Sequence, residues 1–111
     1  MPTVNSQGDI TADGTEQTVW DVTTNKWFSG YIDLENMQSG DTTTVKRYIQ
    51  VRGTGVATLV LEWSETYTDA QTAKKIIYVP PMPSDVEYKV TLQQTAGTNR
   101  VYPWKLFEAW D

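Results

Sequence analysis

Apolar and polar residues alternate along most of this chain, with the period of two that is typical of half-buried β-strands. In residues 57–67, for example, Ala57, Leu59, Leu61 and Trp63 alternate with mainly polar side chains. The chain shows no sustained apolar stripe with the period of a helix. The pattern predicts an all-β chain of about seven strands, at residues 16–22, 27–34, 42–52, 57–67, 75–79, 86–94 and 101–110.

Two glycine positions refine this pattern. Gly30 shares one face of its predicted strand with Phe28, Ile32 and Leu34. A glycine there either lets a large neighbour, such as a tryptophan, pack over the backbone, or it marks a bulge. Gly53-Thr54-Gly55 stands between two alternating runs and predicts a hairpin that pairs them antiparallel.

Prolines indicate where strands end. Pro80-Pro81-Met82-Pro83 is predicted to stop the strand at 75–79, because three prolines remove three backbone donors. Pro103 argues against a central position for the last strand, since proline in sheets favours edges and bulges. Both faces of that strand are nevertheless largely apolar, which predicts that it is central or covered by another surface.

The length of 111 residues predicts one domain. Residues 1–14 are polar and end on the turn dipeptide Asp13-Gly14, so they are predicted to form an arm outside the core. Residues 15–111 are predicted to form an antiparallel β-sandwich of jelly-roll type, with a small β-barrel as the alternative.

Composition removes most of the chemistry available to a small domain. Cysteine and histidine are both absent, which excludes disulfides, thiolate zinc sites and Ser-His-Asp triads. The net charge of −5 opposes binding to nucleic acid. No apolar run approaches the length of a membrane span. The first residues of the sequence do not show the pattern of a signal peptide. We expect a soluble chain with no cofactor.

Two sets of acidic residues are candidate sites. Glu62 and Glu65 would permit acid–base chemistry, but on a regular strand they point to opposite faces. Asp9, Asp13 and Glu16 supply oxygen ligands near a glycine, but their spacing does not match a calcium-binding loop. We therefore predict no enzyme activity and no metal site. A small carboxylate-dependent hydrolase is the third hypothesis, behind the two binding functions given below.

Aromatic residues are the informative excess, with five tryptophans, six tyrosines and two phenylalanines. Trp20 and Trp63 are predicted to lie in the core. Exposed rings flanked by Asn, Gln and Asp could bind a sugar, whereas aromatics with methionine and proline in loops favour a protein interface. The predicted interface residues are Trp27, Met37, Pro81, Met82, Trp104 and Trp110.

Three segments carry a resemblance to a known class of protein: Thr11-Ala-Asp-Gly-Thr-Glu-Gln-Thr18, Gly30-Tyr-Ile-Asp-Leu-Glu-Asn-Met-Gln-Ser-Gly-Asp41 and Tyr88-Lys-Val-Thr-Leu-Gln-Gln-Thr-Ala-Gly-Thr98. In these turn and strand patterns the chain resembles small all-β proteins from the structural modules of tailed phages and related viruses. The resemblance covers about a third of the residues, and it carries no catalytic residue.

The resemblance implies a bacteriophage-type virion component, such as a capsid decoration protein or a minor capsid protein, present in many copies. Its implied partners are its own copies, with a trimer as the usual assembly, and a major capsid or other virion protein. The alternative is a carbohydrate-binding β-sandwich module that uses exposed aromatics. The first expectation makes the protein a structural protein located in the virion.

Overall fold

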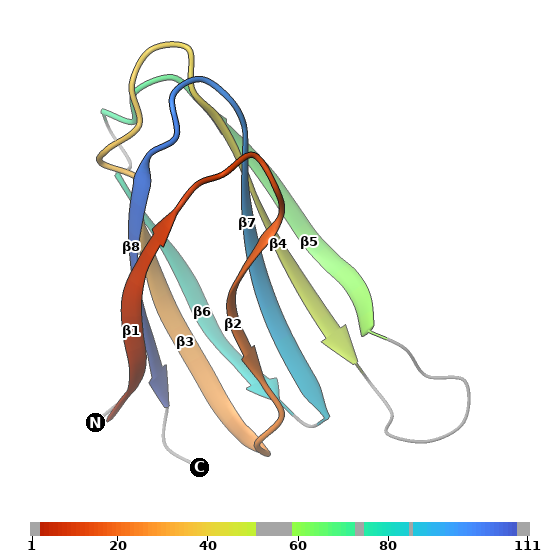
Figure 1. Cartoon of the computed structure of the whole chain (residues 1–111). Coiled ribbons are helices and arrows are strands. Elements are labelled where there is room, and N and C mark those ends of the chain that lie inside the picture. Colours follow the sequence, from red (N-terminus) through yellow and green to blue (C-terminus); the bar gives the residue numbers. More distant parts are fainter. Residues whose placement is uncertain (1–2, 51–58, 73–74, 85, 109–111) are drawn as a thin grey trace.

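The computed structural model describes residues 3–50, 59–72, 75–84 and 86–108, and within these ranges it contains strands and no helix. Two four-stranded antiparallel sheets pack against each other (Figure 1). The predicted antiparallel β-sandwich is confirmed, and the barrel alternative is wrong because the two sheets do not close on each other. The strands are β1 (Thr3–Thr11), β2 (Gln17–Val22), β3 (Lys26–Asp33), β4 (Thr42–Gln50), β5 (Leu59–Thr68), β6 (Ile76–Ser84), β7 (Glu87–Ala96) and β8 (Val101–Glu108).

The strands pair in a nested order. β1 pairs with β8, β2 with β7, β3 with β6 and β4 with β5, all antiparallel. The chain therefore has the connectivity of one long hairpin that folds over into two sheets, which is the jelly-roll topology. Further pairing of β8 with β3, and of β7 with β4, gives the sheet orders β1-β8-β3-β6 and β2-β7-β4-β5.

The core lies between the sheets and is built from every second residue of the internal strands. Tyr88, Val90 and Leu92 of β7 are at most 1% exposed, as their predicted common face requires. Tyr102 and Leu106 of β8 are buried to the same extent. Each apolar side chain of this size contributes about 1.5–3 kcal/mol when it is removed from water.

The amino-terminal segment is part of the sheet and not an arm outside it. Residues 3–11 form β1, which pairs with β8 along its whole length apart from one bulge. Ile10 packs against the core, and Ala12 is buried. The sequence pattern did not indicate this strand because most of its side chains are exposed, and backbone pairing with β8 supplies much of what holds it at the sheet edge.

The proline-rich segment is also a strand. Pro80, Pro81 and Pro83 lie inside β6, so the expectation that they would end the preceding strand is wrong. The reason is position, because β6 is the edge of its sheet and pairs only with β3. On an edge strand, proline removes donors that no neighbouring strand needs.

The other proline expectation is corrected as well, since β8 lies between β1 and β3. Its pairing with β3 runs from Glu108 to Trp104 and ends one residue before Pro103. The proline therefore sits where a donor toward β3 is no longer required.

Strand β5 departs from its predicted alternation. Its register against β4 shifts between Trp63 and Leu61, so Glu62 occupies a bulge. Trp63 packs against the core, but Leu61 is 47% exposed instead of pointing inward. The antiparallel pairing of β4 with β5 is confirmed, while the predicted Gly53-Thr54-Gly55 turn lies outside the described residues.

A tryptophan packs on Gly30, as predicted. A Cβ atom at Gly30 would lie 2.7 Å from the Trp20 ring and 2.7 Å from the Lys105 carbonyl oxygen. The β3–β6 register also shifts beside this glycine, so the bulge is present too. Trp20 belongs to β2 in the opposite sheet, and the missing side chain at Gly30 therefore sets how closely the two sheets approach.

A buried carboxylate joins the loops at one end of the sandwich. Asp41 is 1% exposed and accepts hydrogen bonds from the Gln38 amide, the Thr98 amide and the Arg100 Nε, at 2.8, 3.1 and 2.7 Å. Burial alone would raise the pKa of Asp41, but the bonds from Arg100 and the backbone outweigh it and lower the pKa. Gly97, with φ +91°, allows the loop after β7 to reach this carboxylate.

Replacement of Gly30 by alanine should destabilise the protein by about 1–3 kcal/mol, because the new methyl group overpacks against Trp20. The matched control is Gly8→Ala, where a Cβ would lie 3.5 Å from the Trp104 ring, an ordinary contact. This control should be neutral or stabilising by about 0.5–1 kcal/mol. Urea denaturation measures both free energies of unfolding, and equal effects of the two changes would contradict the close approach at Gly30.

Replacement of Asp41 by asparagine should lower the free energy of unfolding by about 2 kcal/mol at neutral pH, because Arg100 loses a charged acceptor. In the unmodified protein, the pKa of Asp41 is lower in the folded state than in the unfolded state. The stabilisation by Asp41 is therefore complete above its pKa in the unfolded state, and it is lost as the pH falls through its pKa in the folded state. Stability should consequently fall less steeply in Asp41→Asn than in the unmodified chain between pH 7 and pH 3.

The control for this change is Asp69→Asn. Asp69 adopts φ 62° and accepts a hydrogen bond from the Gly40 amide, both of which asparagine can reproduce. Its free energy of unfolding should stay within about 0.5 kcal/mol. Parallel pH profiles of the Asp41 variant and the unmodified protein would show that the carboxylate does not supply the acid sensitivity.

Candidate functional site

The outer face of the β2-β7-β4-β5 sheet carries a hydrogen-bonded polar cluster, with the exposed Leu61 beside Tyr48 on the edge strand β5. The Glu16 carboxylate accepts hydrogen bonds from the Thr91 and Tyr48 hydroxyls at 2.6 and 2.7 Å, and these bonds lower the pKa of Glu16. Lys89 Nζ lies 6.0 Å from the centre of the Tyr48 ring. Within this cluster the polar groups bond to one another, so the cluster offers few free groups to a ligand.

The outer face of the β1-β8-β3-β6 sheet is aromatic instead. Tyr31 lies 5.6 Å from Tyr78 and 5.5 Å from Phe107, measured between ring centres. The three residues come from β3, β6 and β8, so the cluster crosses most of the sheet. Tyr31 and Tyr78 are 44% and 53% exposed, an unusual state for large rings unless the surface is used for binding.

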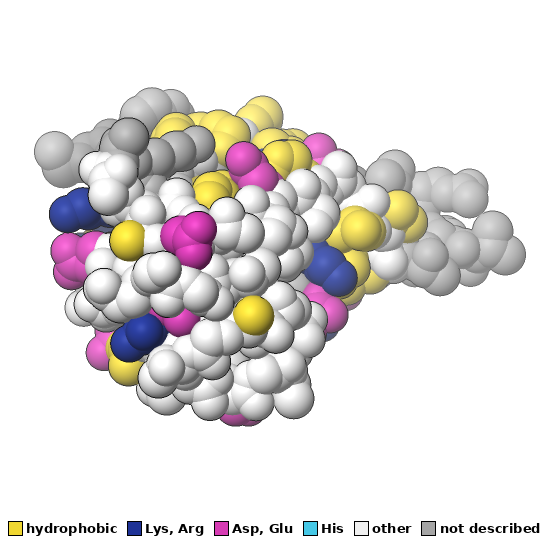
Figure 2. Space-filling model, turned by 90° about the horizontal axis from the view of Figure 1, so that it is seen from above, with side chains coloured by type: hydrophobic (Ala, Val, Ile, Leu, Met, Phe, Trp, Pro, Cys, Tyr) yellow, Lys and Arg dark blue, Asp and Glu magenta, His cyan; other side chains and the backbone are white. Residues whose placement is uncertain are grey.

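Exposed apolar residues concentrate on the two strands at one side of this face. We define the β3–β6 band as Trp27, Tyr31, Ile76, Tyr78 and Pro83. All five are exposed, and the pairs Trp27–Pro83 and Tyr31–Tyr78 are direct neighbours across the two strands. Seen from above, the molecule is mostly polar, with hydrophobic side chains gathered at places on its rim (Figure 2).

A hollow of about 580 Å³ opens on the same outer face, over β1, β8, β3 and the start of β6. Its apolar wall consists of Tyr31, Ile76 and Pro103. Gly8 and Trp104, which pair with each other in the sheet, also contribute to the lining. The volume falls within the range of about 300–1,000 Å³ that is usual for small-molecule sites.

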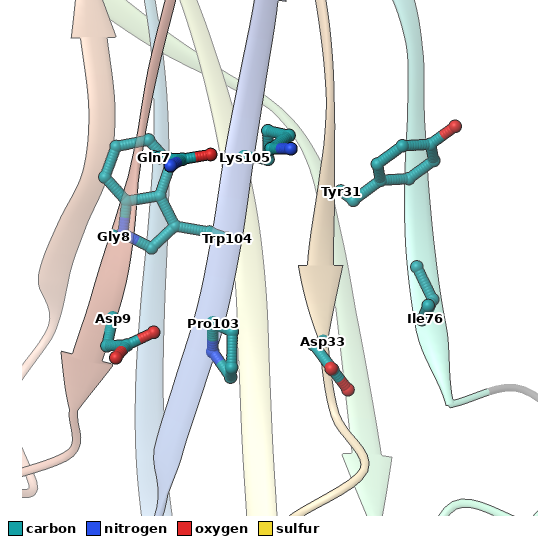
Figure 3. Close-up of a pocket in the computed structure, with 9 residues that line it drawn as sticks. All are labelled: Gln7, Gly8, Asp9, Tyr31, Asp33, Ile76, Pro103, Trp104 and Lys105. Atoms are coloured by element: carbon teal, nitrogen blue, oxygen red, sulfur yellow. The ribbon is translucent and has the colours of Figure 1, made fainter. Parts of the chain in front are cut away.

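Four polar side chains complete the hollow: Gln7, Asp9, Asp33 and Lys105. Figure 3 shows Asp9, Pro103 and Asp33 side by side across three strands, with Gln7, Lys105 and Tyr31 in the next row. Asp33 accepts a hydrogen bond from the Glu35 amide, which fixes its position at the end of β3. Lys105 Nζ lies 5.8 Å from the Phe107 ring.

Among the residues that the structure describes, the side chains of Gln7 and Asp9 make no hydrogen bond or ion pair. These two side chains are therefore free to bind a ligand or water. Asp13 and Glu16, which stand near Asp9 in the sequence and whose spacing with it does not match a calcium-binding loop, are engaged elsewhere. Asp13 binds the Thr15 amide and hydroxyl, and Glu16 belongs to the polar cluster of the other sheet.

The described ranges contain no group of three or more acidic residues that could hold a metal ion. The other acidic pair is also accounted for by local partners. Glu62 forms an ion pair with Arg47, and Glu65 accepts a hydrogen bond from the Tyr67 hydroxyl. Neither of these two carboxylates lines the hollow.

Three of the predicted interface residues lie on or beside the β3–β6 band. Trp27 is 46% exposed at the start of β3, and Pro81 is exposed on β6. Met82 is half-buried, because it pairs with the inward-facing Phe28 and packs against the core.

Of the remaining three, Met37 and Trp104 are not exposed residues, although Trp104 contributes to the lining of the hollow. Met37 is 1% exposed, so its assignment to a loop surface buried only on assembly is corrected; it is a core residue. Trp104 is half-buried and packs 6.2 Å from Trp20, so it belongs mainly to the interior. Trp110 lies outside the described residues.

Sequence reasoning missed Tyr31, Tyr78, Phe107 and the hollow itself. A signal was available for Tyr31, because assignment of Phe28 and Ile32 to one face places Tyr31 on the other. The hollow had no such signal, since it depends on β1 pairing with β8.

Comparison with known proteins places the chain in no family: no family model, no curated protein and no solved structure matches it. In the described part of the chain, no helix has the length and apolar character needed to cross a membrane. Function must therefore be argued from the geometry of the site.

Proposed function

We propose that this protein is a non-enzymatic virion structural protein, a capsid decoration or minor capsid component that stabilises the particle through protein–protein contacts. The observation that carries the proposal is the β3–β6 band, an exposed apolar strip on the outer face of one sheet. An exposed strip of this kind is typical of a subunit that buries it against a neighbour.

The fold adds support of a weaker kind. Jelly rolls are common in capsid proteins, but they also occur in lectins, so the topology alone does not separate the two functions. The proposed partners are further copies of this chain, in a ring such as a trimer, and a major capsid protein.

Ring geometry favours protein contact over a flat sugar-stacking platform for the aromatic cluster. The planes of Tyr31 and Phe107 meet at 84°, and those of Tyr31 and Tyr78 meet at 44°. A platform for an extended sugar chain needs rings that lie nearly in one plane. Tilted rings instead leave pockets and ridges that a protein surface fills.

The proposal predicts that the unmodified protein self-associates and that Tyr78→Lys weakens this association at least about tenfold, as expected when a charge replaces a central aromatic contact. Light scattering over a concentration series measures the change. Because the Tyr78 side chain is 53% exposed, thermal unfolding should shift little.

The matched control is Thr18→Lys, which adds the same charge at an exposed position on β2, away from the band. It should leave association unchanged. An unmodified protein that stays monomeric throughout the series, or equal losses in the two variants, would remove the band as the assembly surface.

A further inference from the structure

We propose that the hollow over β1, β8 and β3 binds a neutral saccharide, as a single pyranose ring or the end of a short glycan. This inference goes beyond the structural function, because it gives the same subunit a ligand site beside its assembly surface.

The apolar wall fits one side of a sugar ring. Pro103 lines the hollow from β8, Tyr31 from β3 with its ring directed toward β6, and Ile76 from β6 (Figure 3). The C–H groups on one side of a pyranose pack against an apolar wall, while its hydroxyls remain at the edge of the ring. A hollow with one apolar wall and several polar groups suits this distribution.

The polar groups supply both kinds of hydrogen-bonding partner that hydroxyls require. Asp9 and Asp33 are acceptors, Lys105 is a donor, and the Gln7 amide is both. Gln7 and Asp9 are exposed and have no other partner among the described residues, so binding would displace water and would not require an intramolecular bond to break. Asp33 is already held by the Glu35 amide, which keeps one acceptor in place before binding.

The mixture of charges selects a neutral ligand. An anion would meet the carboxylates of Asp9 and Asp33, and a cation would meet the ammonium group of Lys105. A polyhydroxylated neutral molecule can use all three without repulsion. We therefore assign the site to saccharides in preference to phosphates, nucleotides or basic peptides.

The site and the assembly surface overlap only at Tyr31 and Ile76. Gln7, Asp9, Pro103 and Lys105 lie on β1 and β8, whereas the β3–β6 band lies on the two strands at the other end of the sheet order, on the same outer face. The two properties can therefore be tested with substitutions that touch only one of them.

The experiment is a titration followed by nuclear magnetic resonance of the backbone amides, with the methyl glycosides of glucose, galactose, mannose and N-acetylglucosamine as probes. At least one glycoside should shift the amide signals of Gly8, Asp9 and Lys105 in a saturable way. Asp9→Ala should weaken this binding by about tenfold or more, because a charged hydrogen-bond acceptor is lost. The control Asp21→Ala removes an exposed carboxylate from β2 in the other sheet and should have no effect.

Absence of saturable shifts with all four glycosides would overturn the proposal, and so would equal affinity in the Asp9 and Asp21 variants. If N-acetylarginine amide bound more strongly than every glycoside, the proposal of a neutral ligand would be overturned in favour of a cationic ligand. Tyr78→Lys should retain saccharide binding while it loses self-association. A failure of the saccharide site is thus distinguishable from a failure of the assembly surface.

Discussion

The packing of Trp20 is the interaction on which the rest of the structure depends. Its ring comes from β2, covers Gly30 of the opposite sheet and lies 6.2 Å from both Tyr88 and Trp104. One side chain therefore fixes the distance between the sheets and the position of Trp104 on β8. Trp104 in turn packs beside Gly8, which lets β1 lie flat against β8. The lining of the hollow on the outer surface is thus set by a contact in the core.

The two outer faces follow different rules although the sheets share one core. On the β2-β7-β4-β5 sheet, the polar side chains of Glu16, Thr91 and Tyr48 bind one another, and the exposed apolar Leu61 lies beside them on the edge strand. On the other sheet, Tyr31 and Tyr78 are exposed, and none of the described elements covers them. The free energy of folding does not require large rings at such positions, since they bury only about half of their surface. Their presence is better explained by contacts outside the chain.

Period-two alternation was sufficient to predict the sandwich and the approximate positions of most strands, because internal strands such as β7 must place apolar residues on one side. Gly30 could also be interpreted correctly, since a glycine on a core face implies a large neighbour. The strands that escaped prediction in part, β1 and β6, are both sheet edges. At an edge, backbone pairing tolerates polar side chains and prolines, so the local sequence carries a weak signal. The hollow escaped for a related reason, because it combines residues from β1, β3, β6 and β8 that only the topology brings together.

The prolines of β6 also restrict how this side of the molecule can meet a neighbour. Pro80, Pro81 and Pro83 lack the backbone donors that an added strand would need, so the free edge of β6 is poorly suited to continue the sheet into another chain. In the proposed assembly, contact on this side would come from side chains, such as the exposed Trp27 and Tyr78 nearby. The edge of β6 resists strand addition, whereas the face beside it favours apolar contact. This combination permits a defined assembly and limits uncontrolled aggregation.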